Sequence, residues 1–190
     1  KGKIWDSLRY PQRYCDIEEW TEELSEKIQE LLERNALEVE VTAIGVGSRG
    51  HVDFRNQRLL STTIMKVTPG FDLCGRLKNQ FGLPVYIDND VKAAACGELL
   101  FGAGIQFQDF VCYNVGTGIA AAVVVNGKLV RGKGNNAGEI GYDLLAGPAS
   151  DSSFRDLESQ ASGRGIERVT GMPAAVVFDK ARNGGRRAEE

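Results

Sequence analysis

Apolar residues near the start of the chain recur at the three- and four-residue steps of an amphipathic helix. They stand between Asp16 and Arg34, at Ile17, Trp20, Leu24, Ile28 and Leu31. This spacing places them on one face of a helix, with charged residues on the opposite face. Asp16 can cap the first turn, with Glu19 three residues later. The pattern therefore predicts a helix over 16–34 that packs its apolar face on a core.

Shorter apolar runs then alternate with helical patterns. Apolar and polar residues alternate over 37–43 and lead into a strand predicted over 44–46. Further strands are predicted over 85–87, 110–115 and 119–125, and helices over 73–81 and 91–101. Asn126-Gly127 predicts a hairpin turn into 128–130, and the tail from Asp156 indicates helix, loop and helix. Strands that alternate with helices place the chain in the α/β class.

Composition excludes several classes of protein. The 190 residues are 42% hydrophobic and 26% charged, with a net charge of −3, so no basic patch favours a nucleic-acid partner. No apolar run is long enough to span a membrane. The four cysteines are widely spaced and there is one histidine, which does not fit a metal site. Such cysteines fit a reducing, cytoplasmic setting better than a disulfide framework.

Two loops are candidates for ligand binding, and one of them suits phosphate. The turn Gly116-Thr117-Gly118 joins two apolar runs and exposes backbone N–H groups, which suits an anionic phosphate. Alone it is a weak signal, because Gly-rich hairpin turns are common in proteins that bind no phosphate. The loop Gly47 to Gly50 follows the strand over 44–46, and such strand ends usually bind ligands in open α/β sheets.

Carboxylates and an amide supply candidates for sugar chemistry. Asp90 directly follows a buried strand and is either a helix N-cap or a general base that takes a sugar hydroxyl proton. Asn89 offers the donor and the acceptor that a sugar hydroxyl needs. Glu139 is either a solvated loop carboxylate or a partner for two hydroxyls. Glu158, His51 and Lys92, taken alone, are expected to be solvated surface residues, and Asp88 to cap or turn.

A set of motifs in fixed order resembles a known family. The motifs are Gly45-Val46-Gly47-Ser48-Arg49-Gly50-His51-Val52-Asp53, Asp88-Asn89-Asp90 with Ala93-Ala94-Ala95 and Glu98, Gly116-Thr117-Gly118-Ile119, Asn126-Gly127-Lys128-Leu129, Gly132, Ala137-Gly138-Glu139-Ile140-Gly141 and Leu157-Glu158-Ser159-Gln160-Ala161-Ser162-Gly163. They resemble the ROK family of bacterial sugar kinases and sugar-responsive repressors over nearly the whole chain.

The resemblance implies a ribonuclease-H-like (actin/hexokinase) fold of two α/β domains with the sugar in the cleft between them. Residues 1–104 would be the remainder of a small N-terminal domain that carries the catalytic Asp, and 105–190 the first part of a larger C-terminal domain, with 102–108 as the joint. Carried over by position, Asp90 would be the catalytic base. The implied sugar-binding residues are Gly50, Asn89, Glu139 and Glu158, and Gly116, Thr117 and Gly118 would lie near the ATP phosphates.

This sequence departs from the family pattern in several places. Tyr142 stands where His is frequent, and 149–155 lacks the cysteines that bind structural zinc, so we expect no zinc and a Tyr142 hydroxyl at the sugar. Arg49 stands where Pro is usual, and Ala120-Ala121 where Gly-Gly is usual. The chain does not begin with Met and lacks the family's Asp-x-Gly-Gly-Thr hairpin. We therefore expect a piece of a longer protein, incomplete at both ends and inactive by itself.

Two functions from different classes follow from the resemblance. The first is a kinase that transfers the γ-phosphoryl group of Mg²⁺-ATP to a hydroxyl of a hexose or amino sugar, and Asp90 with the Gly-Thr-Gly turn favours it. The alternative is a sugar-responsive transcriptional repressor whose DNA-binding domain lies outside this chain. A sugar-binding protein without catalysis is a third. Family members are usually homodimers or larger, so the expected partners are a small-molecule sugar and further copies of the chain, most simply as a dimer, with no membrane.

Overall fold

The computed structural model describes residues 2–11, 16–145 and 155–184. Its helices are α1 (Ile17–Asn35), α2 (Leu73–Phe81), α3 (Asp90–Phe101), α4 (Leu157–Ala161), α5 (Gly163–Thr170) and α6 (Ala174–Arg182). Its strands are β1 (Ile44–Ser48), β2 (His51–Asp53), β3 (Arg58–Ser61), β4 (Val85–Asn89), β5 (Phe110–Val115), β6 (Ile119–Val125), β7 (Lys128–Leu129), β8 (Leu144–Leu145) and β9 (Arg155–Asp156). Short 3-10 turns are η1 (Ala103–Gln106), η2 (Lys133–Asn135) and η3 (Ile140–Tyr142).

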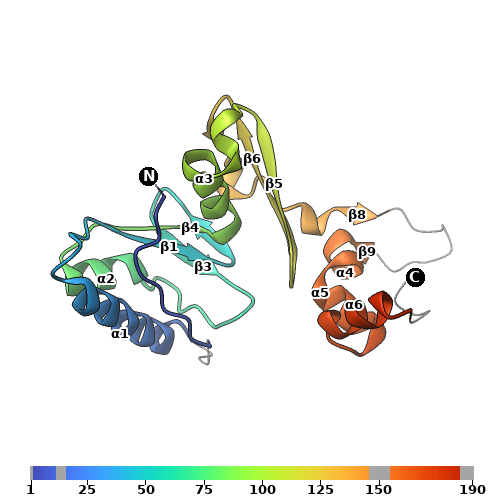
Figure 1. The fold of residues 1–190 in the computed structure, drawn as a ribbon, viewed down its shortest axis with the longest axis horizontal. Coiled ribbons are helices and arrows are strands. Elements are labelled where there is room, and N and C mark those ends of the chain that lie inside the picture. The colour runs from blue at the N-terminus through green and yellow to red at the C-terminus, as the bar shows by residue number, and fades with distance from the viewer. Residues whose placement is uncertain (1, 12–15, 146–154, 185–190) are drawn as a thin grey trace.

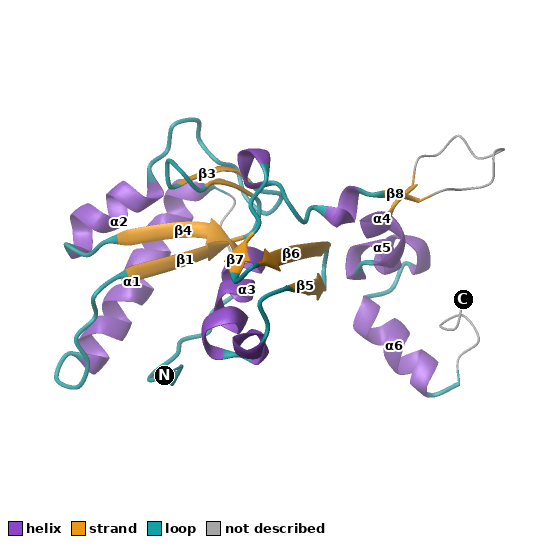
Figure 2. Ribbon diagram, turned by 90° about the horizontal axis from the view of Figure 1, so that it is seen from above, coloured by secondary structure: helices purple, strands orange, loops and turns teal. Residues whose placement is uncertain are grey.

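The first part of the molecule is a parallel strand pair covered by two helices. β1 and β4 pair in parallel from Ile44 opposite Val85 to Ser48 opposite Asn89. Figures 1 and 2 show α1 and α2 together on one face of this pair. The core between them holds Ile17, Leu77 and Ile87, each at most 1% exposed. The predicted helices over 16–34 and 73–81 are confirmed, and Asp16 caps α1 by accepting a hydrogen bond from Glu19 N at 3.0 Å.

A small antiparallel hairpin, β2–β3, follows β1 and was not predicted. Val52 and Leu59 anchor it in the core at 1% and 4% exposure. The Asp53 carboxylate accepts hydrogen bonds from the N–H groups of Arg55 and Asn56, which closes the turn. This hairpin brings the end of β3 beside Gly50.

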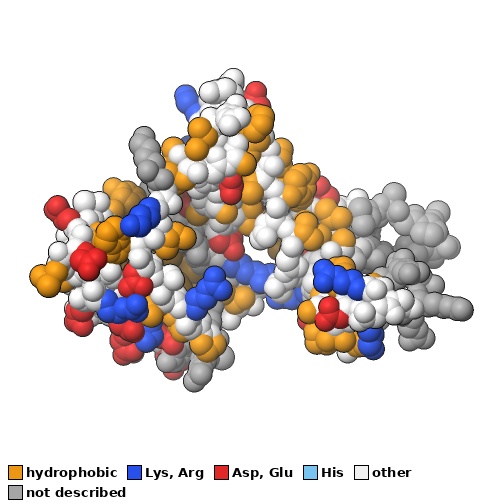
Figure 3. Space-filling view, viewed as in Figure 1, with side chains coloured by type: hydrophobic (Ala, Val, Ile, Leu, Met, Phe, Trp, Pro, Cys, Tyr) orange, Lys and Arg blue, Asp and Glu red, His pale blue; other side chains and the backbone are white. Residues whose placement is uncertain are grey.

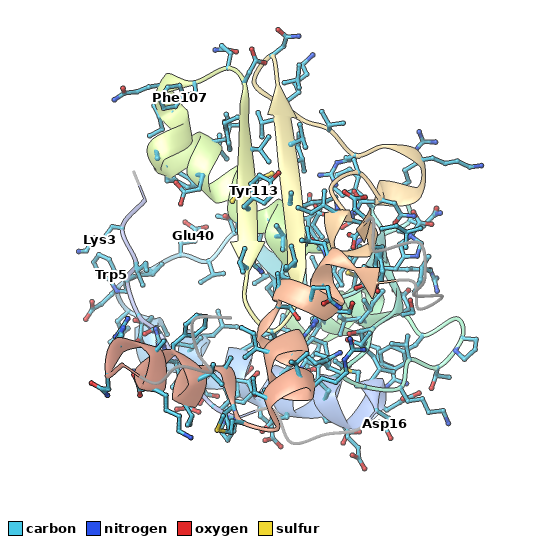
Figure 4. All side chains as sticks on the ribbon, turned by 90° about the vertical axis from the view of Figure 1, so that its right-hand side faces the viewer. Lys3, Trp5, Asp16, Glu40, Phe107 and Tyr113 are labelled. Carbon is cyan, nitrogen blue, oxygen red and sulfur yellow. The ribbon has the colours of Figure 1, made fainter. Side chains whose placement is uncertain are left out.

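The second part is the β5–β6 hairpin with α3 against one face (Figure 1). Val91 and Ala95 of α3 are buried on Ala122 of β6, and these small side chains allow a close approach. Tyr113 lies on the opposite face of the hairpin and is 65% exposed (Figure 4). The predicted joint over 102–108 contains η1, and the proposed division at 104–105 stays a prediction.

The tail forms α4, α5 and α6, which gather beside the tip of the β5–β6 hairpin (Figure 1). The sequence predicted two helices here, and there are three. Asp156 and Ser162 each cap a helix by accepting an N–H three residues later, so two short helices start in quick succession. No helix in the described ranges is long and apolar enough to cross a membrane.

Candidate functional site

A cavity of about 710 Å³ opens where these parts meet. Figure 3 shows a hollow between the part with α1 and α2 and the part with α4–α6, with Lys and Arg side chains beside it. Every predicted catalytic or sugar-binding residue lines the cavity, namely Gly50, Asn89, Asp90, Glu139, Tyr142 and Glu158. Thr117 and Gly118 of the turn also line it, whereas Gly116 does not. Residues up to about 110 positions apart in the chain are thus brought to one space.

Asn89 and Asp90 stand at the junction of β4 and α3. The helix cap is Asn89, whose Oδ1 accepts hydrogen bonds from Val91 N at 3.1 Å and Lys92 N at 3.3 Å. Its Nδ2 donates to Gly50 O at 3.2 Å, which leaves one amide hydrogen to offer. Asp90 is the first residue of α3, is half-buried, and uses Oδ1 to accept from Val91 N. Asn89 rather than Asp90 is therefore the helix cap, and Asp90 lines the cavity.

Gly50 has to be glycine for a steric reason. Its φ is +112°, a conformation that L side chains rarely adopt, and a Cβ there would overlap Ser61 O at the end of β3. Its carbonyl oxygen accepts the Asn89 hydrogen bond. Gly50 therefore joins the β2–β3 hairpin to the end of β4.

Two glycines fix the loop that carries Glu139. A Cβ on Gly138 would overlap Ala121 O, and one on Gly141 would overlap Ile119 O, so both lie directly on the backbone of β6. Ala121 N also donates to Gly138 O at 2.7 Å. Glu139 is held over the cavity between these contacts, and its side chain is 38% exposed.

Lys92 corrects one expectation from the sequence. We expected a solvated side chain, but it is only 1% exposed, and its Nζ lies 3.8 Å from Glu139 Oε1. The side chain is enclosed because α3 starts against the β5–β6 hairpin and the Glu139 loop. Glu139 therefore has a buried positive neighbour.

Glu158 is likewise not the solvated helix-start charge expected from its position alone. It is half-buried, and its Oε2 accepts a hydrogen bond from Ile119 N at 2.9 Å, directly after the Gly-Thr-Gly turn. The amino end of α5 binds the same turn, because Gly163 N and Arg164 N donate to Gly116 O and Thr117 O at 2.8 and 3.2 Å. These contacts fix the turn in place.

Two amide groups of the turn itself are available to bind an acceptor. Gly116 N donates to Gly118 O at 2.9 Å within the turn. The N–H groups of Thr117 and Gly118 have no hydrogen-bond acceptor among the residues that the structure describes. Two adjacent unpaired amides at a hairpin tip form a typical anion-binding concavity.

The remaining candidates have mixed placements. Tyr142 lines the cavity with 67% of its surface exposed. His51, expected at the surface, is half-buried and its Nε2 lies 2.8 Å from Gly134 O. Asp88 was expected to cap or turn, but it lies in β4, and its carboxylate is bound by Arg131 Nη1 at 2.9 Å and Asn135 Nδ2 at 3.1 Å.

Several lining residues had no signal in the sequence. Ser61, Thr62 and Thr63 reach the cavity only because the unpredicted β2–β3 hairpin carries them there. Arg49 also lines the cavity, and for this residue the sequence did give signals, because it lies in the loop after the strand over 44–46 and stands where Pro is usual.

In the described ranges, no group of three or more His, Cys, Asp or Glu could hold a metal ion. The zinc expectation concerns residues 149–155, of which 149–154 lie outside the described residues. Burial and the Asp72 carboxylate raise the pKa of the Cys74 thiol to about 11, so this thiol stays protonated at neutral pH.

The fold and the cavity define a class of protein: an α/β fold with a polar cleft at the carboxyl end of parallel strands. A model of the ROK family matches residues 2–190. The beta-glucoside kinase of Listeria monocytogenes is 31% identical over 153 residues, which make up 74% of this chain and 52% of that protein. The chain belongs to the ROK family.

Solved structures agree with this family. The crystal structure of ROK hexokinase from Thermus thermophilus matches with a TM-score of 0.75 and 28% identity. The match covers 95% of this chain and 62% of the hexokinase chain. A ROK family glucokinase from Streptomyces griseus, in complex with glucose and AMPPNP, matches with a TM-score of 0.66 and 26% identity. This match covers 88% of this chain and 62% of the glucokinase chain. The predicted ribonuclease-H-like (actin/hexokinase) fold is confirmed. The chain spans about half the length of curated relatives such as the Listeria kinase.

Proposed function

We propose that the protein is a ROK sugar kinase, which transfers the γ-phosphoryl group of ATP to a hydroxyl of a hexose or amino sugar. The observation that carries this proposal is the placement of the Asp90 carboxylate in the same cavity as the unpaired N–H groups of Thr117 and Gly118. A base and an anion-binding turn in one cleft are what phosphoryl transfer to a hydroxyl requires.

Each sugar-facing residue has a role that its contacts allow. Asn89 donates its remaining amide hydrogen, because its oxygen is used by the helix cap. Glu139 accepts hydrogen bonds from hydroxyl groups, and the Lys92 ammonium lies 3.8 Å from its Oε1. Gly50, Tyr142 and Glu158 complete the sugar side of the cavity.

The reaction follows from this arrangement. Asp90 accepts the proton of the sugar hydroxyl as its oxygen bonds to the γ-phosphorus, and the bond from that phosphorus to the β-phosphate bridging oxygen breaks to release ADP. The amides of Thr117 and Gly118 bind the phosphate oxygens. Mg²⁺ supplies charge neutralisation for the triphosphate when bound. The Streptomyces griseus structure, which holds glucose and AMPPNP, supports this pairing of ligands.

Sugar-dependent ADP release by the full-length protein tests the proposal across a panel of hexoses and amino sugars. Loss of a general base typically costs about 10²- to 10⁴-fold in rate, so Asp90→Asn is expected to lower kcat by that factor with an unchanged melting temperature. Asp179→Asn is the matched control, because Asp179 is exposed on α6. Equal rates for wild type and Asp90→Asn on every sugar would refute the proposal.

A further inference from the structure

Arg49 places a positive charge in the cleft that the proposed mechanism does not use. It lies between β1 and β2 and lines the cavity together with Asp90 and Gly118. A Cβ built on Gly118 would lie 3.1 Å from Arg49 Nη2, so the guanidinium reaches from the first part of the molecule to the Gly-Thr-Gly turn. The side chain therefore crosses the cleft.

The guanidinium of Arg49 has N–H groups without a hydrogen-bond partner among the described residues. Within the described part of the chain it makes no hydrogen bond and no ion pair, although Arg49 is half-buried. The Glu158 carboxylate lies beside the same built Cβ, with its Oε2 2.5 Å away, and that oxygen accepts a hydrogen bond from Ile119 N. A guanidinium carries five N–H donors and no acceptor.

Hydrogen-bond donors without a partner among the described residues therefore lie around the Gly-Thr-Gly turn. They are the guanidinium of Arg49, which lies beside Gly118, and the N–H groups of Thr117 and Gly118. A ligand that satisfies all of them needs several acceptor oxygens and negative charge. A phosphoryl group has both, and its geometry matches the bidentate fork of Arg.

We propose that Arg49 is a phosphoryl-binding residue of this cleft, acting together with the Gly-Thr-Gly turn. This deepens the proposed function and rests on it for the identity of the reaction. The bound phosphoryl group belongs either to the nucleoside triphosphate or to a phosphorylated sugar. In both cases the positive charge of Arg49 offsets the negative charges of Glu158 and Asp90, which would otherwise repel an anion.

Equilibrium binding tests the proposal, with AMPPNP, glucose 6-phosphate and glucose as probes for the full-length protein in isothermal titration calorimetry. Arg49→Gln is expected to weaken binding of at least one phosphorylated probe by tenfold or more, and Arg49→Lys by less, because Lys keeps the charge without the fork. Glucose binding should change less than twofold. Arg55→Gln, which removes the same charge from the exposed β2–β3 turn, should change nothing.

Each outcome is decisive. Loss of AMPPNP binding alone assigns Arg49 to the nucleotide, loss of glucose 6-phosphate binding alone assigns it to a phosphorylated sugar, and loss of both shows that the site takes either. If Arg49→Gln melts like wild type and binds both probes like wild type, the proposal is wrong. Arg49-dependent phosphate binding without sugar-dependent turnover would overturn the proposed function and leave this inference standing.

Discussion

At the scale of single residues, the Lys92–Glu139 pair makes a testable claim about stability. The Lys92 side chain is 1% exposed and Glu139 lies 3.8 Å away. Removing one partner of a buried pair leaves the other charge without compensation, so Glu139→Gln should lower the free energy of unfolding by about 1–2 kcal/mol, reduced by the partial exposure of Glu139. Lys92→Met keeps the volume and removes the buried charge, so it should cost less. Urea unfolding measures both.

The double variant is the control for this pair. If the cost of Glu139→Gln comes from an isolated Lys92 charge, Lys92→Met in the same chain should recover most of it. Sugar affinity should fall in the two variants that carry Glu139→Gln, because an amide oxygen is a weaker acceptor for hydroxyls than a carboxylate. A double variant as unstable as the sum of the single ones would contradict the pairing.

Cys74 makes a prediction about pH. Burial, helped by the Asp72 carboxylate, raises its pKa to about 11 from 9.0. The folded state therefore holds the thiol proton more tightly than the unfolded chain, which gives stability that is present below pH 9.0 and lost as pH rises towards 11. The difference in unfolding free energy between wild type and Cys74→Ala should be larger at about pH 8 than at about pH 10.5. A constant difference would show that the thiol titrates normally.

Residue identities in the site were easier to predict than residue environments. Asp90, Asn89 and Glu139 were named from motifs, and the cavity brings them together. The predicted environments of Lys92 and Glu158, both solvated, were wrong, because burial depends on which distant segment covers a side chain. For Lys92 that segment is the Glu139 loop, more than forty positions later.

At the scale of elements, the loop that carries Glu139 depends on contact with β6. A Cβ on Gly138 would overlap Ala121 O, and Gly138 has a φ of +89°. Gly138→Ala should therefore displace the loop, with a loss of about 2 kcal/mol in unfolding free energy and a clear loss of sugar affinity. Calorimetry and urea unfolding measure the two effects.

Gly97→Ala is the matched control for this substitution. Gly97 lies inside α3, and a Cβ there would have open space around it. Alanine favours helix over glycine by roughly 0.5–1 kcal/mol, so this variant should be as stable as wild type or more so. Equal effects of the two substitutions would show that the contact with β6 does not matter.

Helices and strands with a strong hydrophobic periodicity were predicted correctly, whereas short elements with a weak periodicity were missed. The spacing of Ile17, Trp20 and Leu24 was sufficient for α1, and the two apolar runs for β5–β6. The alternation over 37–43 forms no strand in the structure, and Leu37 is fully exposed. A strand needs a partner, and β4 pairs only from Ile44 onwards. β2 and β3 were missed because three or four residues are too few to show a period.

At the scale of the whole molecule, the cleft depends on how the two parts are held together. Its walls come from β4, the β2–β3 hairpin, the β5–β6 turn and α4. No local sequence pattern predicts that these elements lie around one cavity. The family resemblance predicted a sugar cleft between domains, whereas periodicity predicted only the elements. The contacts that join the parts became visible only in the structure.

Arg131 is the centre of these joining contacts, and it supports the last prediction. Its Nη1 lies 2.9 Å from Asp88 Oδ2 and donates to Asn135 Oδ1 at 3.0 Å, and its guanidinium lies 3.2 Å from the centre of the Phe54 ring. Asn135 in turn donates to Val52 O at 3.3 Å. A segment after β7 is thereby fixed to β2 and to the residue that precedes Asn89 and Asp90.

Arg131→Met should therefore weaken both the fold and the proposed catalysis. The side chains of Arg131 and Asp88 are 26% and 14% exposed, so the loss of this pair with its cation–π contact should cost about 2–3 kcal/mol in unfolding free energy. Arg34→Met breaks a more exposed pair, Arg34–Asp6, with side chains 44% and 22% exposed, and should cost less than about 1 kcal/mol. Because Asp88 precedes the proposed base, Arg131→Met should also lower kcat in the full-length protein, whereas Arg34→Met should not. Similar losses of stability in the two variants would show that Arg131 does not join the two parts.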